Sequence, residues 1–325
     1  MTLVELAARL GSTEGYESLS TAAGTPWVAV RLDGQPSPSF HAQPNCPVVG
    51  IVESNEPPQE VPEVVDVVAA PEEAATVAGA IDRHPVAASV LVRLLRHNTR
   101  VGAPDSAFAE SLAYSTLQHG AEFRAWLASR ESRSPRPEPA APAVLIERRD
   151  DALRITLNRP HKRNAYSASL RDGLCEALEL AMVDDSVRHV VLDGAGACFS
   201  AGGDLDEFGE ATDAGVAHVS RMARNAGALI DCLRDRVEAR LHGACIGAGI
   251  ELPAFAGRVV ARENAFFQLP EVGMGLSPGA GGTTSILRRI GRRRLAYMAL
   301  TGARIDVRSA LDWGLIDAVE EGPGL

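Results

Sequence analysis

A proline-rich stretch divides the chain and limits what it can fold into. Residues 131–142 read ESRSPRPEPAAP, with four prolines in twelve positions and no large apolar side chain. Proline lacks a backbone N–H and has a fixed φ, so such a stretch is disfavoured in helices and in inner strands and behaves as a stiff, extended linker. We therefore predict a linker over 131–143, which precedes a separate core over 144–325.

The part before the linker combines weak strand signals with helical periodicity. Short apolar runs at 27–32 and 47–52 indicate strands, so residues 1–64 are expected to form a small α/β or irregular segment. Residues 65–130 are predicted to be helical, because prolines and acids there are typical of first helical turns and the apolar residues recur at helical spacing. The expected helices begin at Pro71 and Pro85, and a third runs over about 105–130.

The part after the linker shows a strand, a helix and a strand in succession. Residues 144–146 and 153–157 indicate strands, and the second alternates apolar with polar side chains. A helix is expected from about Ser167, followed by a buried strand at 189–192. This order predicts an α/β layer structure.

Charge and cysteine usage exclude several classes of function. Lys and Arg total 32 against 42 Asp and Glu, and the net charge of -10 argues against a nucleic-acid partner, although arginines cluster over 288–294. The five cysteines show neither CxxC nor zinc-ligand spacing, which favours reduced thiols in a cytoplasmic protein. Residues 1–9 do not read as a signal peptide, and the weakly charged run 241–257 is too rich in glycine and polar groups for a membrane span. We expect a soluble chain with no membrane partner.

Three glycine-rich segments carry the candidate chemistry. FSAGGDL (199–205) follows a strand, and its small residues either let a ligand reach backbone N–H groups or form an ordinary tight turn. GACIGAGIELP (243–253) places Glu251 in an apolar run, which fits either proton transfer at a raised pKa or close helix packing. Glu271 lies in similar surroundings within 266–283. Two such carboxylates beside exposed backbone N–H groups can form an acid–base pair at an oxyanion site, and neither has metal-ligand partners, so no metal is expected.

Taken in this order, the segments resemble the crotonase (enoyl-CoA hydratase/isomerase) superfamily. The resemblance covers about 144–319 and implies a crotonase-like ββα spiral for the core of this α/β chain. The segments that carry it are ITLNRPHKRNAY (155–166), FSAGGDLDEF (199–208), HGACIGAGIEL (242–252) and LPEVGMGLSPGAGGT (269–283).

The resemblance also implies a ligand and a set of site residues. The ligand would be an acyl-CoA thioester, with coenzyme A as part of the substrate and no separately bound cofactor. The backbone N–H groups of Gly203 and Ala248 would form the oxyanion hole. Glu251 would orient and deprotonate the water that attacks Cβ, and Glu271 would deliver or remove the proton at Cα. The implied substrate-binding residues are Ala201, Asp204 and Leu205 for the adenine and Arg159, Lys162 and Arg163 for the phosphates. Exposed basic residues near a turn are also often merely solvated.

The order of the segments departs from the family in one respect. Members usually continue with a helical tail, whereas six residues follow Val319 here. Residues 65–96 and 109–130 resemble that tail, so the N-terminal helices are expected to replace it, as in a circular permutation, or else to form a separate accessory domain. If they replace it, the helix at 105–130 should pack on the core near the coenzyme A cleft, in its own subunit or a neighbour. Its side chains Phe123, Trp126 and Leu127 should then be buried there.

The resemblance leaves three functions open. Hydration of a 2-enoyl-CoA is the leading expectation, because both glutamates are present and isomerases generally need one base. The alternatives are double-bond isomerisation or other enolate chemistry on a CoA thioester, and a non-catalytic acyl-CoA-binding scaffold subunit, since the fold alone does not choose among them. The family further implies a homotrimer or hexamer and a place in fatty acid metabolism.

Overall fold

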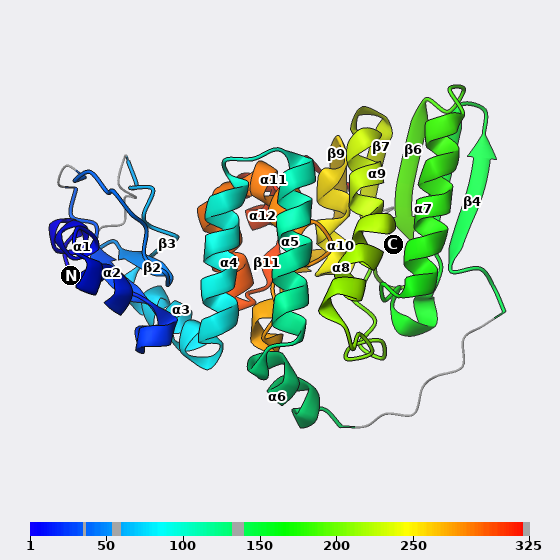
Figure 1. Ribbon diagram of the computed structural model, residues 1–325. Coiled ribbons are helices and arrows are strands. Elements are labelled where there is room, and N and C mark those ends of the chain that lie inside the picture. Colours follow the sequence, from blue (N-terminus) through cyan, green and yellow to red (C-terminus); the bar gives the residue numbers. More distant parts are fainter. Residues whose placement is uncertain (35–36, 54–59, 132–139, 321–325) are drawn as a thin grey trace.

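The structure, a computed structural model, describes residues 1–34, 37–53, 60–131 and 140–320. Most of the proline-rich linker therefore lies outside the described residues. Figure 1 shows a small sheet unit at the N-terminal end, a layer of helices beside it, and a larger sheet with its own helices at the far end.

The N-terminal unit is a parallel sheet with short helices. Its elements are α1 (Leu3–Leu10), α2 (Thr13–Ser18), η1 (Thr21–Ala23), β1 (Val28–Arg31), β2 (Val48–Ile51) and β3 (Val67–Ala69). The strand order is β1-β2-β3, and β3 lies within the range predicted to be helical. Leu3, Leu6 and Leu10 lie on one face of α1 and are buried with Val28 and Val30 in a small core of this unit.

Four helices follow. They are α3 (Pro71–Arg83), α4 (Pro85–Asn98), α5 (Ala103–Gln118) and α6 (Ala121–Ser129). The starts predicted at Pro71 and Pro85 are confirmed, because proline at the first helical position loses no hydrogen bond. The single helix predicted over 105–130 is wrong. The helix breaks at Gly120. Its N–H donates a hydrogen bond to the carbonyl of Leu117, and the residue is the N-terminal cap of α6.

The core after the linker is built on a six-stranded sheet. Its strands are β4 (Val144–Arg149), β5 (Ala152–Leu157), β6 (His189–Gly194), β7 (Val237–Leu241), β9 (Arg258–Arg262) and β12 (Ala318–Glu320). The order is β12-β9-β7-β6-β5-β4, and every pair is parallel except the β4–β5 hairpin. The predicted alternation in β5 is confirmed: Leu153, Ile155 and Leu157 are buried and Arg154 is exposed.

A second sheet and six helices complete the core. The sheet strands, in the order β11-β10-β8, are β8 (Ala244–Ile246), β10 (Phe266–Gln268) and β11 (Ile305–Asp306). The helices are α7 (Ala168–Val183), α8 (Ala214–Ala223), α9 (Ala226–Cys232), α10 (Ala248–Glu251), α11 (Gly282–Thr301) and α12 (Val307–Trp313), with short 3-10 turns that include η5 (Glu271–Met274). The mixed α/β layer architecture is as predicted. In the described parts of the chain no helix is long and apolar enough to cross a membrane.

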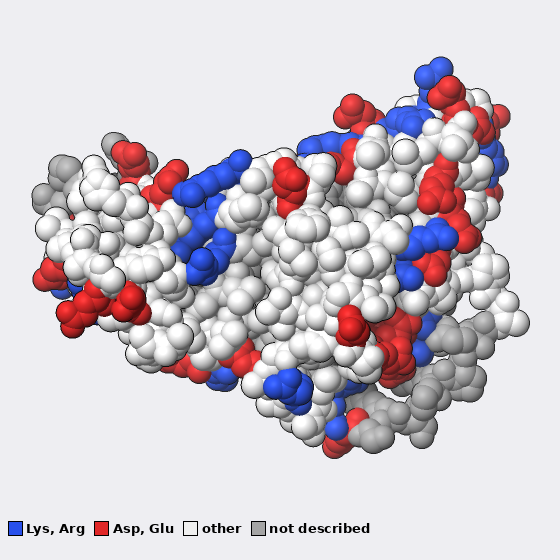
Figure 2. All heavy atoms as spheres, viewed as in Figure 1, with Lys and Arg blue, Asp and Glu red and all other residues white. Residues whose placement is uncertain are grey.

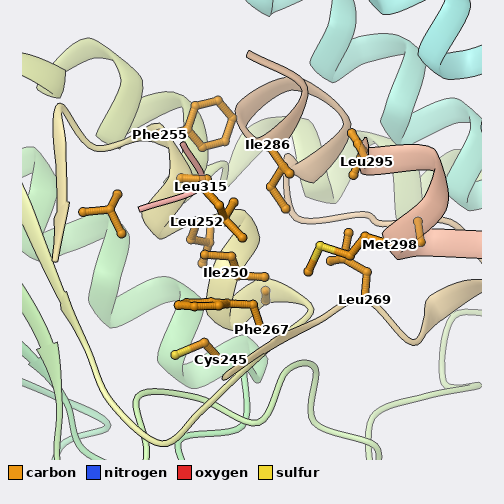
Figure 3. Close-up of a cluster of buried hydrophobic side chains, with 14 of the residues drawn as sticks. Cys245, Ile250, Leu252, Phe255, Phe267, Leu269, Ile286, Leu295, Met298 and Leu315 are labelled. Atoms are coloured by element: carbon orange, nitrogen blue, oxygen red, sulfur yellow. The ribbon is translucent and has the colours of Figure 1, made fainter. Parts of the chain in front are cut away.

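One continuous apolar core joins the helices before the linker to the sheets after it. Val77 of α3 and Leu91 of α4 belong to the same buried cluster as Leu192 of β6. Figure 3 shows part of this cluster, where side chains of α10, α11 and β10 such as Ile250, Ile286 and Phe267 point toward one another. Each fully buried side chain of this size contributes about 1.5–3 kcal/mol, so the two parts stabilise each other.

Helix α6 packs on the core through aromatic rings. Phe123 is buried, and its ring centroid lies 5.7 Å from that of Trp126 and 6.3 Å from that of Phe208 in the core. Leu127 is partly buried and lies against Gly209. The expected burial against the core is confirmed for Phe123, whereas Trp126 and Leu127 are only partly buried there, and the contact is made within one chain.

Arginines join the N-terminal unit to α4 and α11. Asp66 is 1% exposed and forms ion pairs with Arg96 of α4 and with Arg292 of α11, the latter at 2.6 Å. Arg293 donates a hydrogen bond to the carbonyl of Val61 at 2.6 Å. Figure 2 shows Lys and Arg atoms gathered at this junction. Part of the arginine cluster of the sequence is thus used inside the protein.

Candidate active site

The three glycine-rich segments meet around one cavity of about 450 Å³. It lies between the face of α5, the region of α8 and α9, and the turns before α10 and α11. Gly203, Ala248, Glu251 and Glu271, the residues predicted to be catalytic, all line it. Segments that are distant in the sequence therefore place both carboxyls and both candidate N–H groups against one space.

Glu251 lies at the end of α10 with its carboxylate held by backbone. The side chain is 2% exposed, and its Oε2 accepts hydrogen bonds from the N–H groups of Ala280 at 2.8 Å and Gly282 at 2.9 Å. A Cβ on Gly282 would lie 2.8 Å from this oxygen, so only glycine allows the approach. Burial raises the pKa of Glu251 well above its usual value, and the charges of Glu271 and Glu110 add to the effect.

Glu271 begins η5 after Pro270 and presents a free oxygen. Within the described chain, its buried Oε2 has no hydrogen-bond partner. A Cβ on Gly247 would lie 2.5 Å from its Oε1, and Gly247 has a φ of 50°, so this close approach requires glycine. Burial, reinforced by the charge of Glu110, raises the pKa of Glu271 to about 8. The carboxyl can therefore hold a proton near neutral pH and has an oxygen available to a substrate.

The two candidate oxyanion donors lie on paired segments. Ser200 accepts a hydrogen bond from the N–H of Ile246 at 3.0 Å and donates its own N–H to the carbonyl of Ala244 at 3.1 Å. This pairing brings Gly203 and Ala248 to the same cavity. Neither of their N–H groups donates to another described residue. Two backbone donors are thus available to a ligand oxygen.

The residues predicted to bind the adenine and the phosphates of coenzyme A differ in their exposure and in their ion pairs. Asp204 lines the cavity and is 4% exposed, with Oδ2 in ion pairs with Arg159 at 2.9 Å and with Lys162 at 3.3 Å. Arg159 is also buried, so both basic groups are engaged with Asp204. Arg163 and Leu205 are exposed, and Ala201 is partly buried.

A third carboxylate in this cavity is not foreseen from the sequence. Glu110 of α5 is 3% exposed and lines the same space as Glu251 and Glu271. The one signal is that the buried face of α5 is polar, with Ser106, Ser111 and Ser115 at helical spacing around it. In the described parts of the chain, no cluster of His, Cys, Asp and Glu is arranged to hold a metal ion.

Comparisons with known proteins agree with the fold. The sequence profile of the family described as Enoyl-CoA hydratase/isomerase matches residues 147–321. The chain is 36% identical over 176 residues to 2,3-dehydroadipyl-CoA hydratase of Escherichia coli, covering 54% of this chain and 68% of the relative. It is 32% identical over 169 residues to mevalonyl-coenzyme A hydratase of Aspergillus fumigatus, covering 52% of this chain and 63% of the relative. The crystal structure of enoyl-CoA hydratase from Thermoplasma volcanium superposes with a TM-score of 0.51 at 33% identity, covering 55% of this chain and 72% of that one.

The fold and the site together define an α/β protein in which two glutamates and two backbone N–H groups without a partner among the described residues meet at one glycine-lined cavity. The chain belongs to the enoyl-CoA hydratase/isomerase family, as its resemblance to the crotonase superfamily predicts. The matched stretches span about two thirds of the length of these two relatives.

Proposed function

We propose that this protein adds water across the double bond of a 2-enoyl-CoA thioester. The observation that carries the proposal is the meeting of Glu251, Glu271 and the free N–H groups of Gly203 and Ala248 at one cavity. Hydration needs both a group that activates water and a group that handles the Cα proton. The two named hydratases among the relatives support the same chemistry.

In the proposed mechanism the thioester carbonyl oxygen accepts hydrogen bonds from Gly203 and Ala248. As water attacks Cβ, negative charge moves to that oxygen, and one such donor is worth about 3 kcal/mol of barrier. Glu251 takes a proton from the water while the oxygen–Cβ bond forms. Glu271 gives its proton to Cα, so the π bond is replaced by new C–O and C–H bonds. The two carboxyls have then exchanged protonation states.

The protonation of the site fits this sequence of steps. Three carboxyls share the cavity, those of Glu110, Glu251 and Glu271, and burial raises the pKa of each, so their titrations depend on one another. Of the two catalytic glutamates, Glu251 accepts two backbone N–H groups that stabilise its ionised form, whereas Oε2 of Glu271 accepts no hydrogen bond from a described residue. Glu251 therefore suits the base and Glu271 the acid.

The coenzyme A moiety is proposed to lie along the segment that contains Ala201, Asp204 and Leu205. The exposed guanidinium of Arg163 is available to a phosphate. Arg159 and Lys162, through their ion pairs with Asp204, would shape this end of the cleft as well as add positive charge. Coenzyme A would thus enter and leave as part of the substrate.

Double-bond isomerisation is a second candidate. It needs a single base that moves a proton between two carbons, and the unpartnered oxygen of Glu271 suits that role. In that reaction Glu251 would contribute little, which separates the two candidates by experiment.

The test is to follow the enoyl thioester absorbance band with crotonyl-CoA and longer 2-enoyl-CoAs. Loss of the band with formation of the 3-hydroxyacyl-CoA supports hydration. Conversion of a 3-enoyl-CoA to the conjugated 2-enoyl-CoA, with no 3-hydroxyacyl-CoA formed, supports isomerisation. Binding of the thioesters without turnover of either kind would overturn both and leave the scaffold alternative.

We also propose a homotrimer or a pair of trimers. Large apolar side chains are exposed on neighbouring faces of α5 and α8, and covering them would be favourable. Sedimentation at micromolar concentration measures the mass, and a monomer would contradict the proposal. The exposed side chains are Phe108, Leu112, Val216, Val219 and Met222.

A further inference from the structure

A carboxylate from before the linker reaches the candidate active site. Glu110 lies in the middle of α5, yet it is 3% exposed and lines the cavity together with Glu251 and Glu271. Burying a carboxylate is costly unless its oxygens are hydrogen-bonded. Its partners therefore indicate what it does.

Glu110 and Glu251 divide four consecutive backbone N–H groups at the start of α11. Those of Ala280 and Gly282 donate to Oε2 of Glu251 at 2.8 and 2.9 Å. Those of Gly281 and Thr283 donate to Oε1 and Oε2 of Glu110 at 2.7 and 2.9 Å. The donors alternate along the chain, so neither carboxylate can shift without taking a donor from the other.

Further hydrogen bonds hold this arrangement from behind. The Thr283 hydroxyl donates to Oε2 of Glu110 at 2.6 Å and accepts from Nδ2 of Asn98 in α4 at 3.0 Å. One turn before Glu110 on α5, the hydroxyl of Ser106 bonds that of Thr284 at 2.6 Å. Several hydrogen bonds thus fix the start of α11 against α4 and α5. Among the side chains that make them, only Glu110 can carry a charge, and it lines the cavity.

We infer that Glu110 is a positioning residue of this site: by occupying the N–H groups of Gly281 and Thr283, it confines Glu251 to the N–H groups of Ala280 and Gly282 and so fixes the catalytic carboxylate against the cavity. The inference rests on the proposed hydration for its effect on turnover. It assigns part of the active site to residues that precede the core.

The charge of Glu110 gives the inference a second signature. Facing it are Glu251 of α10 and Glu271 of η5, and on the side of α5 and α8 lie Tyr114 and Arg221. Burial raises the pKa of Glu110 itself, while its hydrogen bonds from Thr283 and Gly281 and the charge of Arg221 favour its ionised form. When it is ionised, the charge of Glu110 raises the pKa of both catalytic glutamates. Removal of this charge should therefore lower the pKa values of the two remaining carboxyls.

The experiment compares Glu110→Gln and Glu110→Ala with Ser106→Ala in the full chain. Ser106→Ala is the matched control, since it removes one buried hydrogen bond between α5 and α11 without changing a charge or the N–H groups that bind Glu251. The carboxyls are titrated by NMR of protein with ¹³C-labelled glutamate carboxyls, which requires no turnover. The pH dependence of kcat/KM with a 2-enoyl-CoA is measured alongside.

For Glu110→Gln we expect the titration of the cavity carboxyls and the rising limb of kcat/KM to move to lower pH. kcat should fall about tenfold to a hundredfold, as for a misplaced catalytic group, with a smaller change in KM. Ser106→Ala should keep the wild-type titration and pH profile. Glu110→Ala should lose at least as much turnover as Glu110→Gln, or fail to fold, in which case Glu110→Gln decides.

An unshifted carboxyl titration in folded Glu110→Gln would overturn the inference, as would an equal loss of kcat in Ser106→Ala. Absence of hydration by the wild-type protein would instead overturn the proposed function. The titration would then decide the inference on its own.

Discussion

At the scale of single residues, the two candidate catalytic glutamates differ in what contacts them. Oε2 of Glu251 is held by two backbone N–H groups, whereas Oε2 of Glu271 is buried without a partner among the described residues. Similar side chains in one cavity are thereby given different tendencies to ionise, which is how a site obtains an acid and a base from the same residue type.

Replacing either carboxyl by an amide should remove hydration while keeping the ligand. Glu251→Gln and Glu271→Gln are each expected to lower turnover by at least about a hundredfold, the range for a general acid or base. Binding of the CoA ester should persist, because the donors of Gly203 and Ala248 are backbone groups. Turnover is measured by enoyl absorbance and binding by calorimetry. Near-normal turnover in either variant would contradict the two-glutamate assignment.

The raised pKa of Glu271 predicts that both turnover and the stability of the fold decrease as the pH rises. As the acid in hydration it must be protonated, so turnover should fall as the pH rises through about 8.

The folded protein also retains a proton on Glu271 that the unfolded chain loses near the ordinary glutamate pKa of 4.5, so rising pH between 4.5 and about 8 destabilises the fold. Glu271→Gln removes this proton linkage. Its Tm relative to wild type should therefore increase from about pH 5 to about pH 8 and then level off; a constant difference would contradict the assignment.

At the scale of elements, α11 connects the regions of the molecule. Its first turn supplies N–H groups to Glu251 and Glu110, its middle carries Arg292 to the N-terminal unit, and its apolar side chains lie in the shared core. The ion pairs of Asp66 with Arg96 and Arg292 are buried, so each charge depends on the others for compensation.

Asp66→Asn should destabilise the fold without altering the chemistry. The change leaves two buried guanidinium groups without their carboxylate, which costs about 3–5 kcal/mol. Turnover per folded molecule should be unchanged, because Asp66 does not line the cavity. Denaturant unfolding measures the loss. The control is Glu63→Gln, which breaks a mostly exposed pair with Arg100 and should cost less than about 1 kcal/mol.

Helices and strands on both sides of the linker are predictable from the sequence where local patterns decide them. Alternation in β5 and the prolines that begin α3 and α4 are local signals, and they were read correctly. The break at Gly120 was missed, because helical residues on both sides carry a similar apolar spacing. Glu251 and Glu271 were found because a carboxylate in an apolar, glycine-rich run is unusual. Glu110 was not, because it lies in an ordinary helical stretch without glycines, AFAESLAY (107–114), and its burial depends on a turn 171 residues away.

At the scale of the whole molecule, the parts before and after the linker form one folded unit. The helices α4, α5 and α6 cover α11, the cavity and Phe208, and the buried cluster runs through both parts. Removing the first part would expose apolar surface and leave the N–H groups of Gly281 and Thr283 without their carboxylate.

A fragment of residues 140–325 alone is therefore expected to fail to fold. Circular dichroism and thermal melting should show no cooperative transition, and CoA-ester binding should be lost. Addition of separately made residues 1–139 serves as the control and should restore some of the binding. If the fragment alone melts cooperatively and binds CoA esters as well as the full chain, the N-terminal part is an independent module.

The position of α11 also determines when the protein can finish folding during synthesis. The ribosome releases α3, α4 and α5 well before α11, because α5 ends at Gln118 and α11 begins only at Gly282, and domains fold as their sequence emerges. Until α11 arrives, the polar face of α5 has no N–H groups to bind and the apolar faces of α3 and α4 have no cover. The helices α3, α4 and α5 must therefore wait, incompletely covered, for a helix made much later in translation, and this long-range closure should make folding slow. In the cell, the chain is thus expected to depend on chaperones between the synthesis of α5 and the synthesis of α11.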